Sequence, residues 1–136
     1  METLLRLFPS TLSPDVHVRR ASEQELHQLE SQPGMLAASF QLVASPEVDT
    51  SIRQAAAIYV KNRISRTWDA SLARGFSDAP SAVSDQDKEV VRSGLLPTIA
   101  SLPPTLRVHI ASAMYSIVRC DFPQAGEVGV QEGVLF

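Results

Sequence analysis

The chain has 136 residues, of which 44% are hydrophobic and 20% charged, and its formal net charge is −3 at pH 7. These proportions are typical of a globular domain, and the acidic balance argues against general nucleic-acid binding. The single cysteine, Cys120, excludes an internal disulfide and favours a reducing compartment. The N-terminal segment lacks the basic start and long apolar run of a secretory signal, and no stretch approaches the roughly 20 apolar residues of a membrane span. We therefore expect no membrane insertion.

Two helices are predicted before the first strong break in the chain. The first spans residues 1–11, and the second begins at Ser13-Pro14-Asp15, where serine caps the helix, proline fits its first position and aspartate opposes its dipole. The packed side of the second helix comprises Val18, Ala21, Ser22, Leu26 and Leu29, and its opposite side comprises Arg20, Glu23, Gln24 and His27. Gln32-Pro33-Gly34 then interrupts the chain.

The third and fourth predicted helices span residues 35–44 and 52–68, and Asp49, Thr50 or Ser51 can cap the fourth. The fourth is apolar on nearly every side, so neighbours must pack against several of its faces. Its small residues Ala55–Ala57 allow those neighbours to approach closely. Its apolar ridge comprises Val60, Ile64 and Trp68, and its most polar side comprises Gln54, Ile58, Lys61 and Ser65. The Trp68 indole nitrogen requires an acceptor if it is buried.

Two more helices follow a predicted loop at residues 69–83. Ser84 to Asp87 carries a helix-start signature, and Pro97 is expected to kink the fifth helix. The sixth helix follows Pro103-Pro104. Its packed side comprises Leu106, Ile110, Ala113, Met114 and Ile117, and its other side comprises Val108, Ser112, Tyr115 and Arg119. The economical interpretation is an all-α fold, an α-solenoid of about three HEAT-like antiparallel helix pairs.

Several short motifs, in this order and spacing, carry a family resemblance. They are Leu12-Ser13-Pro14-Asp15, Val18-Arg19, Arg53 to Ile64, Trp68, Asp87-Lys88, Leu95-Leu96-Pro97 and Asp121-Phe122-Pro123. Together they resemble the N-terminal region of importin-beta-type nuclear transport receptors (karyopherins), most nearly the branch containing importins seven and eight. The resemblance covers residues 1–123. Residues 124–136 lack the Trp-Pro pair of the family and are expected to form a disordered tail.

The resemblance implies a solenoid of HEAT repeats, each with an A and a B helix, whose N-terminal repeats bind GTP-bound Ran through inner B helices. The B helices would be the second, fourth and sixth. This implies the N-terminal portion of a nuclear import receptor that moves between cytoplasm and nucleus and needs no cofactor. Contacts with import cargo and nucleoporins would belong to later repeats of the family, which the chain does not contain.

The same resemblance suggests a set of Ran-binding residues on the B helices. The set comprises Lys61, Gln54, Ile58, Arg20, Gln24, His27, Ser112 and Tyr115. Lys61 is the leading candidate because it matches the family's Lys-Asn pair and lies on the side of its helix least needed for packing. The alternative for Lys61 is a solvated lysine whose stem covers apolar surface. For the other residues the alternative is a plain solvent face.

Other chemistries find little support. Arg53, Arg63 and Arg66 are scattered around their helix instead of forming a phosphate-binding stripe, so solvated or ion-paired arginines are expected. His109 and Cys120 lie about 16 Å apart along one helix, too far for a catalytic dyad. No metal-ligand spacing or phosphate-binding glycine loop is present, so no enzyme is expected.

Three further expectations concern neighbours. The Asn62 amide is expected to face neighbouring helices and be buried. An apolar patch around the fifth and sixth helices is expected to cause self-association or chaperone binding. Two alternatives to the receptor hypothesis remain: a free-standing helical protein-interaction adaptor and a nonfunctional truncated fragment.

Overall fold

The computed structural model describes residues 2–68 and 83–122. Within these ranges the chain forms helices and no strand. The helices are α1 (Glu2–Ser10), α2 (Val16–Leu29), α3 (Met35–Ala44), α4 (Thr50–Thr67), α6 (Asp85–Ser101) and α7 (Pro104–Asp121). The expected tail at 124–136, and the expected loop apart from buried Val83, lie outside the described residues.

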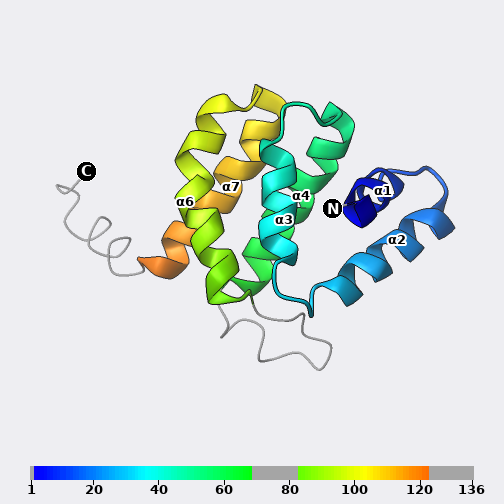
Figure 1. Cartoon of the computed structure of the whole chain (residues 1–136), viewed down its shortest axis with the longest axis horizontal. Coiled ribbons are helices and arrows are strands. Elements are labelled where there is room, and N and C mark those ends of the chain that lie inside the picture. The colour runs from blue at the N-terminus through cyan, green and yellow to red at the C-terminus, as the bar shows by residue number, and fades with distance from the viewer. Residues whose placement is uncertain (1, 69–82, 123–136) are drawn as a thin grey trace.

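Two antiparallel pairs, α3 with α4 and α6 with α7, form the body of the molecule (Figure 1). Helices α3 and α6 lie side by side in one layer, and α4 and α7 lie side by side in the second. Gly94 of α6 permits close approach to α3, since a Cβ atom at this position would lie 2.7 Å from Cε1 of Phe40. The expected all-α architecture of stacked helix pairs is confirmed.

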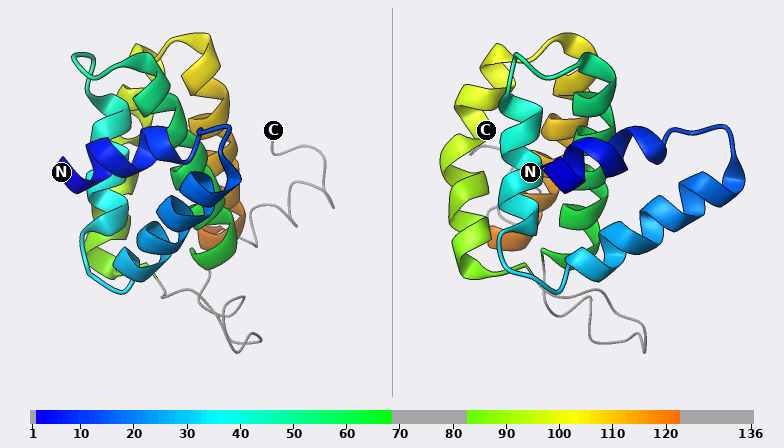
Figure 2. Two further views of the ribbon diagram at one scale, coloured as in Figure 1. Left: turned by 90° about the vertical axis from the view of Figure 1, so that its right-hand side faces the viewer. Right: turned by 45° about the vertical axis from the view of Figure 1, so that its right-hand side comes forward.

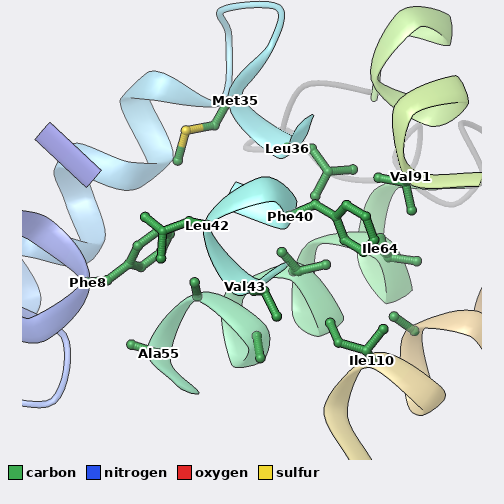
Figure 3. Packing of buried hydrophobic residues seen from close by; sticks show 14 of the residues in the cluster. Phe8, Met35, Leu36, Phe40, Leu42, Val43, Ala55, Ile64, Val91 and Ile110 are labelled. Atoms are coloured by element: carbon green, nitrogen blue, oxygen red, sulfur yellow. The ribbon is translucent and has the colours of Figure 1, made fainter. Parts of the chain in front are cut away.

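Helix α4 occupies the centre, as its sequence predicts. It packs against α1, α3 and α7. Ala55–Ala57, Val60 and Ile64 are all buried, and Trp68 directly after the helix is only 1% exposed. Figure 3 shows side chains from α1, α3, α6 and α7 converging on this helix. Its polar side faces outward as expected, with Gln54 and Ser65 exposed and Ile58 and Lys61 half-buried.

The first pair does not continue the regular stack. Helix α1 crosses the α3–α4 pair instead of lying along it, and α2 diverges from α4 (Figure 2). Consequently only the C-terminal part of α2 is well covered: Ser22 and Leu26 are buried, whereas Val18 and Ala21 are exposed. The prediction that Val18 and Ala21 belong to a packed side is therefore wrong, because none of the described helices covers the beginning of α2.

The helix starts agree with the sequence in two cases and differ in one. Asp49 caps α4 by accepting a hydrogen bond from the Ser51 amide, and Ser84 caps α6 by accepting one from the Asp87 amide. For α2, the cap is Asp15 and not Ser13. The Ser13 hydroxyl instead accepts a hydrogen bond from the Asp15 amide, which makes a turn ahead of the helix.

A polar cluster joins the ends of α4, α6 and α7. The indole Nε1 of Trp68 donates to Oδ1 of Asp121 at 3.1 Å, so the acceptor that Trp68 was predicted to need is present. Arg92 donates to the other oxygen of Asp121 at 3.0 Å, and Lys88 and Arg92 both lie over the indole ring. Burial opposes ionisation of Asp121, but the hydrogen bonds from Arg92 and Trp68 outweigh it and lower the pKa of this carboxyl.

We predict that Asp121→Asn lowers the free energy of unfolding by about 1–2 kcal/mol at neutral pH, since it weakens two hydrogen bonds to a charged acceptor. Because the folded state lowers the Asp121 pKa, this stabilisation is complete above the ordinary value of 3.8. It is lost as the pH falls through the folded-state pKa. Urea unfolding of the wild type and of Asp121→Asn, repeated from neutral pH to below pH 3.8, measures the effect. A difference between them that does not depend on pH would contradict the assignment.

The last two helices carry most of the exposed large hydrophobic side chains of the described residues. These are Leu96, Val108, Tyr115, Val118 and Phe122, with exposed fractions from 47% to 71%. We predict that the 136-residue chain self-associates through this surface. In light scattering, Leu96→Gln with Val118→Gln should reduce the concentration-dependent mass, whereas the control Val18→Gln on α2 should not. A wild-type chain that stays monomeric would contradict this prediction.

Candidate functional site

The divergence of α2 from α4 opens a groove between them, with α1 closing one end. Its volume is about 490 Å³. Its lining residues are Phe8, Thr11, Leu12, Glu23, Leu26, His27, Glu30, Ala55, Ile58, Tyr59, Asn62, Ser65 and Arg66. Most of this surface is apolar, and the charged groups lie toward the C-terminal end of α2. Such a concave surface with a few converging polar groups is the usual form of a binding site.

Glu30 is the polar centre of the groove. It caps the C-terminus of α2, and its side chain is only 3% exposed. Its Oε1 accepts a hydrogen bond from the Tyr59 hydroxyl at 2.8 Å, and Nη1 of Arg63 and Nη2 of Arg66 lie 3.6 and 3.7 Å from the same oxygen. Arg63 also donates to the Glu30 backbone carbonyl at 3.4 Å. These contacts fix the end of α2 to the middle of α4.

The second carboxylate oxygen of Glu30, Oε2, has fewer contacts than Oε1. Oε2 is buried and accepts no hydrogen bond, and Nδ1 of His27 lies 3.4 Å away. The His27 side chain is 54% exposed and therefore stands over this oxygen at the edge of the groove. Burial, followed by the nearby Glu30 carboxylate, raises the pKa of Tyr59 well above its ordinary value of 10, so its hydroxyl remains a donor at neutral pH.

The predicted partner-binding residues divide into three groups. Ile58 and His27 meet in the groove. Gln54 and Lys61 lie on the accessible side of α4, and Ser112 and Tyr115 are exposed on α7, which packs beside α4. Arg20 and Gln24 are exposed on the part of α2 that leads away from α4. Burial of His109 on α7, followed by the nearby charge of Lys61, lowers the pKa of His109, so Lys61 lies close to α7.

Two expectations about α4 are wrong. Asn62 is exposed and lines the groove, because α2 does not cover it. Arg53 is buried, and its Nε donates to the Val43 carbonyl at 3.0 Å, which holds α4 against the end of α3. Arg63 agrees with the expectation of an ion-paired arginine.

The sequence analysis missed Glu30 and Tyr59. Glu30 directly follows α2 and precedes a Pro-Gly break, which made it look like an ordinary solvent-facing residue. One signal was present in the sequence. Tyr59 and Arg63 lie four positions apart on a helix with few solvent-facing positions, so their polar groups must find partners inside the fold. Such groups need a buried acceptor. That acceptor is Glu30, which the end of α2 brings to α4.

The arrangement offers binding surface and no recognisable catalytic centre. His109 and Cys120 both lie on α7, eleven residues apart. Among the described residues, no group of three His, Cys, Asp or Glu side chains could hold a metal ion. None of the helices in the described ranges is long and apolar enough to cross a membrane. The fold defines a helical-repeat protein.

Comparison with known proteins gives the family. Residues 22–101 match the importin-beta N-terminal domain. The chain therefore belongs to the importin-beta N-terminal domain family, and the resemblance noted in its sequence is confirmed.

Individual relatives include both import and export receptors. The chain is 33% identical over 115 residues to the importin beta-like SAD2 homolog of Arabidopsis thaliana, covering 85% of this chain and 11% of the relative. It is 32% identical over 124 residues to exportin-2 of Oreochromis niloticus, covering 91% of this chain and 12% of the relative. Human importin-8 is 26% identical over 124 residues, with 90% of this chain and 12% of the relative covered.

Solved structures agree with these sequence matches. The exportin Cse1 in its cargo-free, cytoplasmic state superimposes with a TM-score of 0.74 at 27% identity, covering 96% of this chain and 13% of Cse1. A structure in which Kap95p binding induces the switch loops of RanGDP to adopt the GTP-bound conformation matches with a TM-score of 0.68 at 22% identity. That match covers 99% of this chain and 16% of the other. The chain thus spans only 11–12% of the length of these curated relatives.

We predict that Glu30→Ala lowers the free energy of unfolding by about 3 kcal/mol, since it removes a buried carboxylate from beside the buried Arg63 guanidinium. Tyr59→Phe should cost about 1 kcal/mol through the lost hydrogen bond. The matched control is Glu25→Ala, which removes an exposed pair with Arg6 and should cost less than about 1 kcal/mol. Equal effects of Glu30→Ala and Glu25→Ala in chemical unfolding would contradict the role given to Glu30.

Proposed function

We propose that this chain is the N-terminal portion of a nuclear import receptor and binds GTP-bound Ran through its inner helices α2, α4 and α7. Its membership of the importin-beta N-terminal domain family is the observation that carries this proposal. The relatives are receptors of transport between nucleus and cytoplasm, and one matching structure concerns Kap95p and RanGDP. We accordingly place the chain in the cytoplasm and nucleus.

The surface expected to meet Ran is supported by the exposure of the predicted residues. Gln54 is exposed and Lys61 and Ile58 are half-buried on the polar side of α4, and Ser112 and Tyr115 are exposed on the adjacent α7. The α4–α7 surface offers the positive charges of Lys61 and Arg119, polar groups and exposed apolar surface to a partner. Because α2 diverges, Arg20 and Gln24 should contribute less than the residues on α4 and α7.

The mechanism is surface complementarity without chemistry by this chain. Ran hydrolyses its own nucleotide, so binding and release depend on which Ran conformation matches the helical surface. A ligand shifts such an equilibrium only by its different affinities for the two states. Cargo and nucleoporin binding would require repeats beyond the three helix pairs here, and three pairs alone should bind Ran weakly. A free-standing helical adaptor remains the second candidate.

The direct test is capture of purified Ran by the immobilised chain, with Ran loaded with GTP or with GDP. We predict selective capture of the GTP form. Equal capture of both forms, or capture of neither by a chain shown to be folded by circular dichroism, would contradict the proposal and favour the adaptor or a nonfunctional fragment.

Lys61→Ala should weaken capture of GTP-loaded Ran by about fivefold, which corresponds to ~1 kcal/mol. The reason is loss of one positive charge from the centre of the proposed interface. Gln86→Ala, at an exposed position in the first turn of α6, is the matched control and should leave capture unchanged. An unchanged affinity for Lys61→Ala would identify this residue as a solvated lysine only.

A further inference from the structure

One buried acceptor in the groove lies within ion-pair distance of His27 but accepts no hydrogen bond. Oε2 of Glu30 accepts no hydrogen bond, although the side chain that carries it is 3% exposed. Buried polar atoms of native proteins are nearly always paired, and each exception calls for an explanation. The Glu30 side chain lines the groove, so a ligand in the groove could supply the missing donor.

The groove around this acceptor is suited to an apolar body. Leu26 of α2 and Ile58 of α4 line opposite sides, and Tyr59 lies beside the carboxylate with its ring 5.5 Å from that of Phe8. The volume of about 490 Å³ lies in the range of small-molecule and side-chain sites, which runs from roughly 300 to 1,000 Å³. A third aromatic ring would extend the Phe8–Tyr59 pair in a favourable geometry.

The charges favour a neutral donor over a cation. Arg63 and Arg66 already lie 3.6 and 3.7 Å from Oε1, so the two guanidinium groups carry one more unit of charge than the Glu30 carboxylate. An ammonium group placed on Oε2 would add a third positive charge in a site screened from water, where its desolvation is costly. A neutral N–H group satisfies the acceptor without that cost.

We propose that this groove binds a tryptophan side chain of a partner protein, with the indole N–H donating to Oε2 of Glu30. Tryptophan combines a large apolar body with one donor and no acceptor that the carboxylate would repel. His27, whose Nδ1 lies 3.4 Å from Oε2, covers the oxygen in the unliganded chain and rotates aside on binding. Its half-exposed side chain can change rotamer readily. The groove shares Ile58 and His27 with the residues predicted to bind Ran, but the tryptophan proposal does not require Ran to be the partner.

The test uses N-acetyl-L-tryptophanamide as the probe and the full 136-residue chain, followed by two-dimensional NMR. We expect saturable shifts of amides near Leu26, Glu30 and Ile58. The matched probe, in which the indole nitrogen carries a methyl group, keeps the shape and loses the donor, and should bind about fivefold more weakly. N-acetyl-L-lysinamide should bind more weakly than either.

Three results would overturn the proposal: equal affinity for the two indole probes, tighter binding of the lysine probe, or no saturable shifts in the groove. Variants provide a second measurement. His27→Ala should bind the probe at least as tightly as the wild type because it uncovers Oε2, whereas Ile58→Ser should weaken binding severalfold through lost apolar contact. Val108→Ser, an exposed change on α7, is the control. Weaker binding by His27→Ala would make His27 itself the ligand contact and contradict the assignment to Glu30.

Discussion

The structure depends on the close packing of helices around α4. Ala55–Ala57 leave almost no side-chain volume on one part of this helix, so neighbouring helices can approach its backbone closely. Burial of its remaining apolar residues supplies the hydrophobic driving force, which grows with the area removed from water. Polar groups on α4 must then be satisfied by neighbours, and Arg53, Arg63 and Trp68 each reach an acceptor on another segment. The packing and the hydrogen bonds of α4 therefore set the positions of the helices around it.

Because the fold depends on packing around α4, the sequence predicts the parts of the fold that pack closely on this helix. The periodicity of α4 and α7 separates covered from accessible residues almost completely, because these helices are long and each packs against two or more neighbours. The class of protein also follows from the order of short motifs. The predicted side of α2 holds only for Ser22 and Leu26, because a periodic pattern indicates which residues could be buried and not whether a neighbour is present.

The candidate site also depends on neighbours that a sequence pattern does not reveal. Ile58 and His27 were identified as candidates, but Glu30, which holds the groove together, was not. Its burial depends on the approach of the end of α2 to α4, a long-range contact with no local signal. The exposure of Asn62 has the same origin. Sequence reasoning therefore identified two residues that line the groove and missed the polar contact that shapes it.

The inclined first pair has a consequence for motion. Beyond its own pairing, α2 is joined to the body mainly through the covered residues near its end and the Glu30 contacts, while its beginning is exposed to solvent. Segments with few buried contacts open at a lower free energy than the global unfolding of a domain. The early turns of α2 should therefore exchange their amide protons sooner than α4, and the terminal pair can reorient while the inner pairs stay intact. The α1–α2 pair is therefore an adjustable arm attached to the more rigid body formed by α3, α4, α6 and α7.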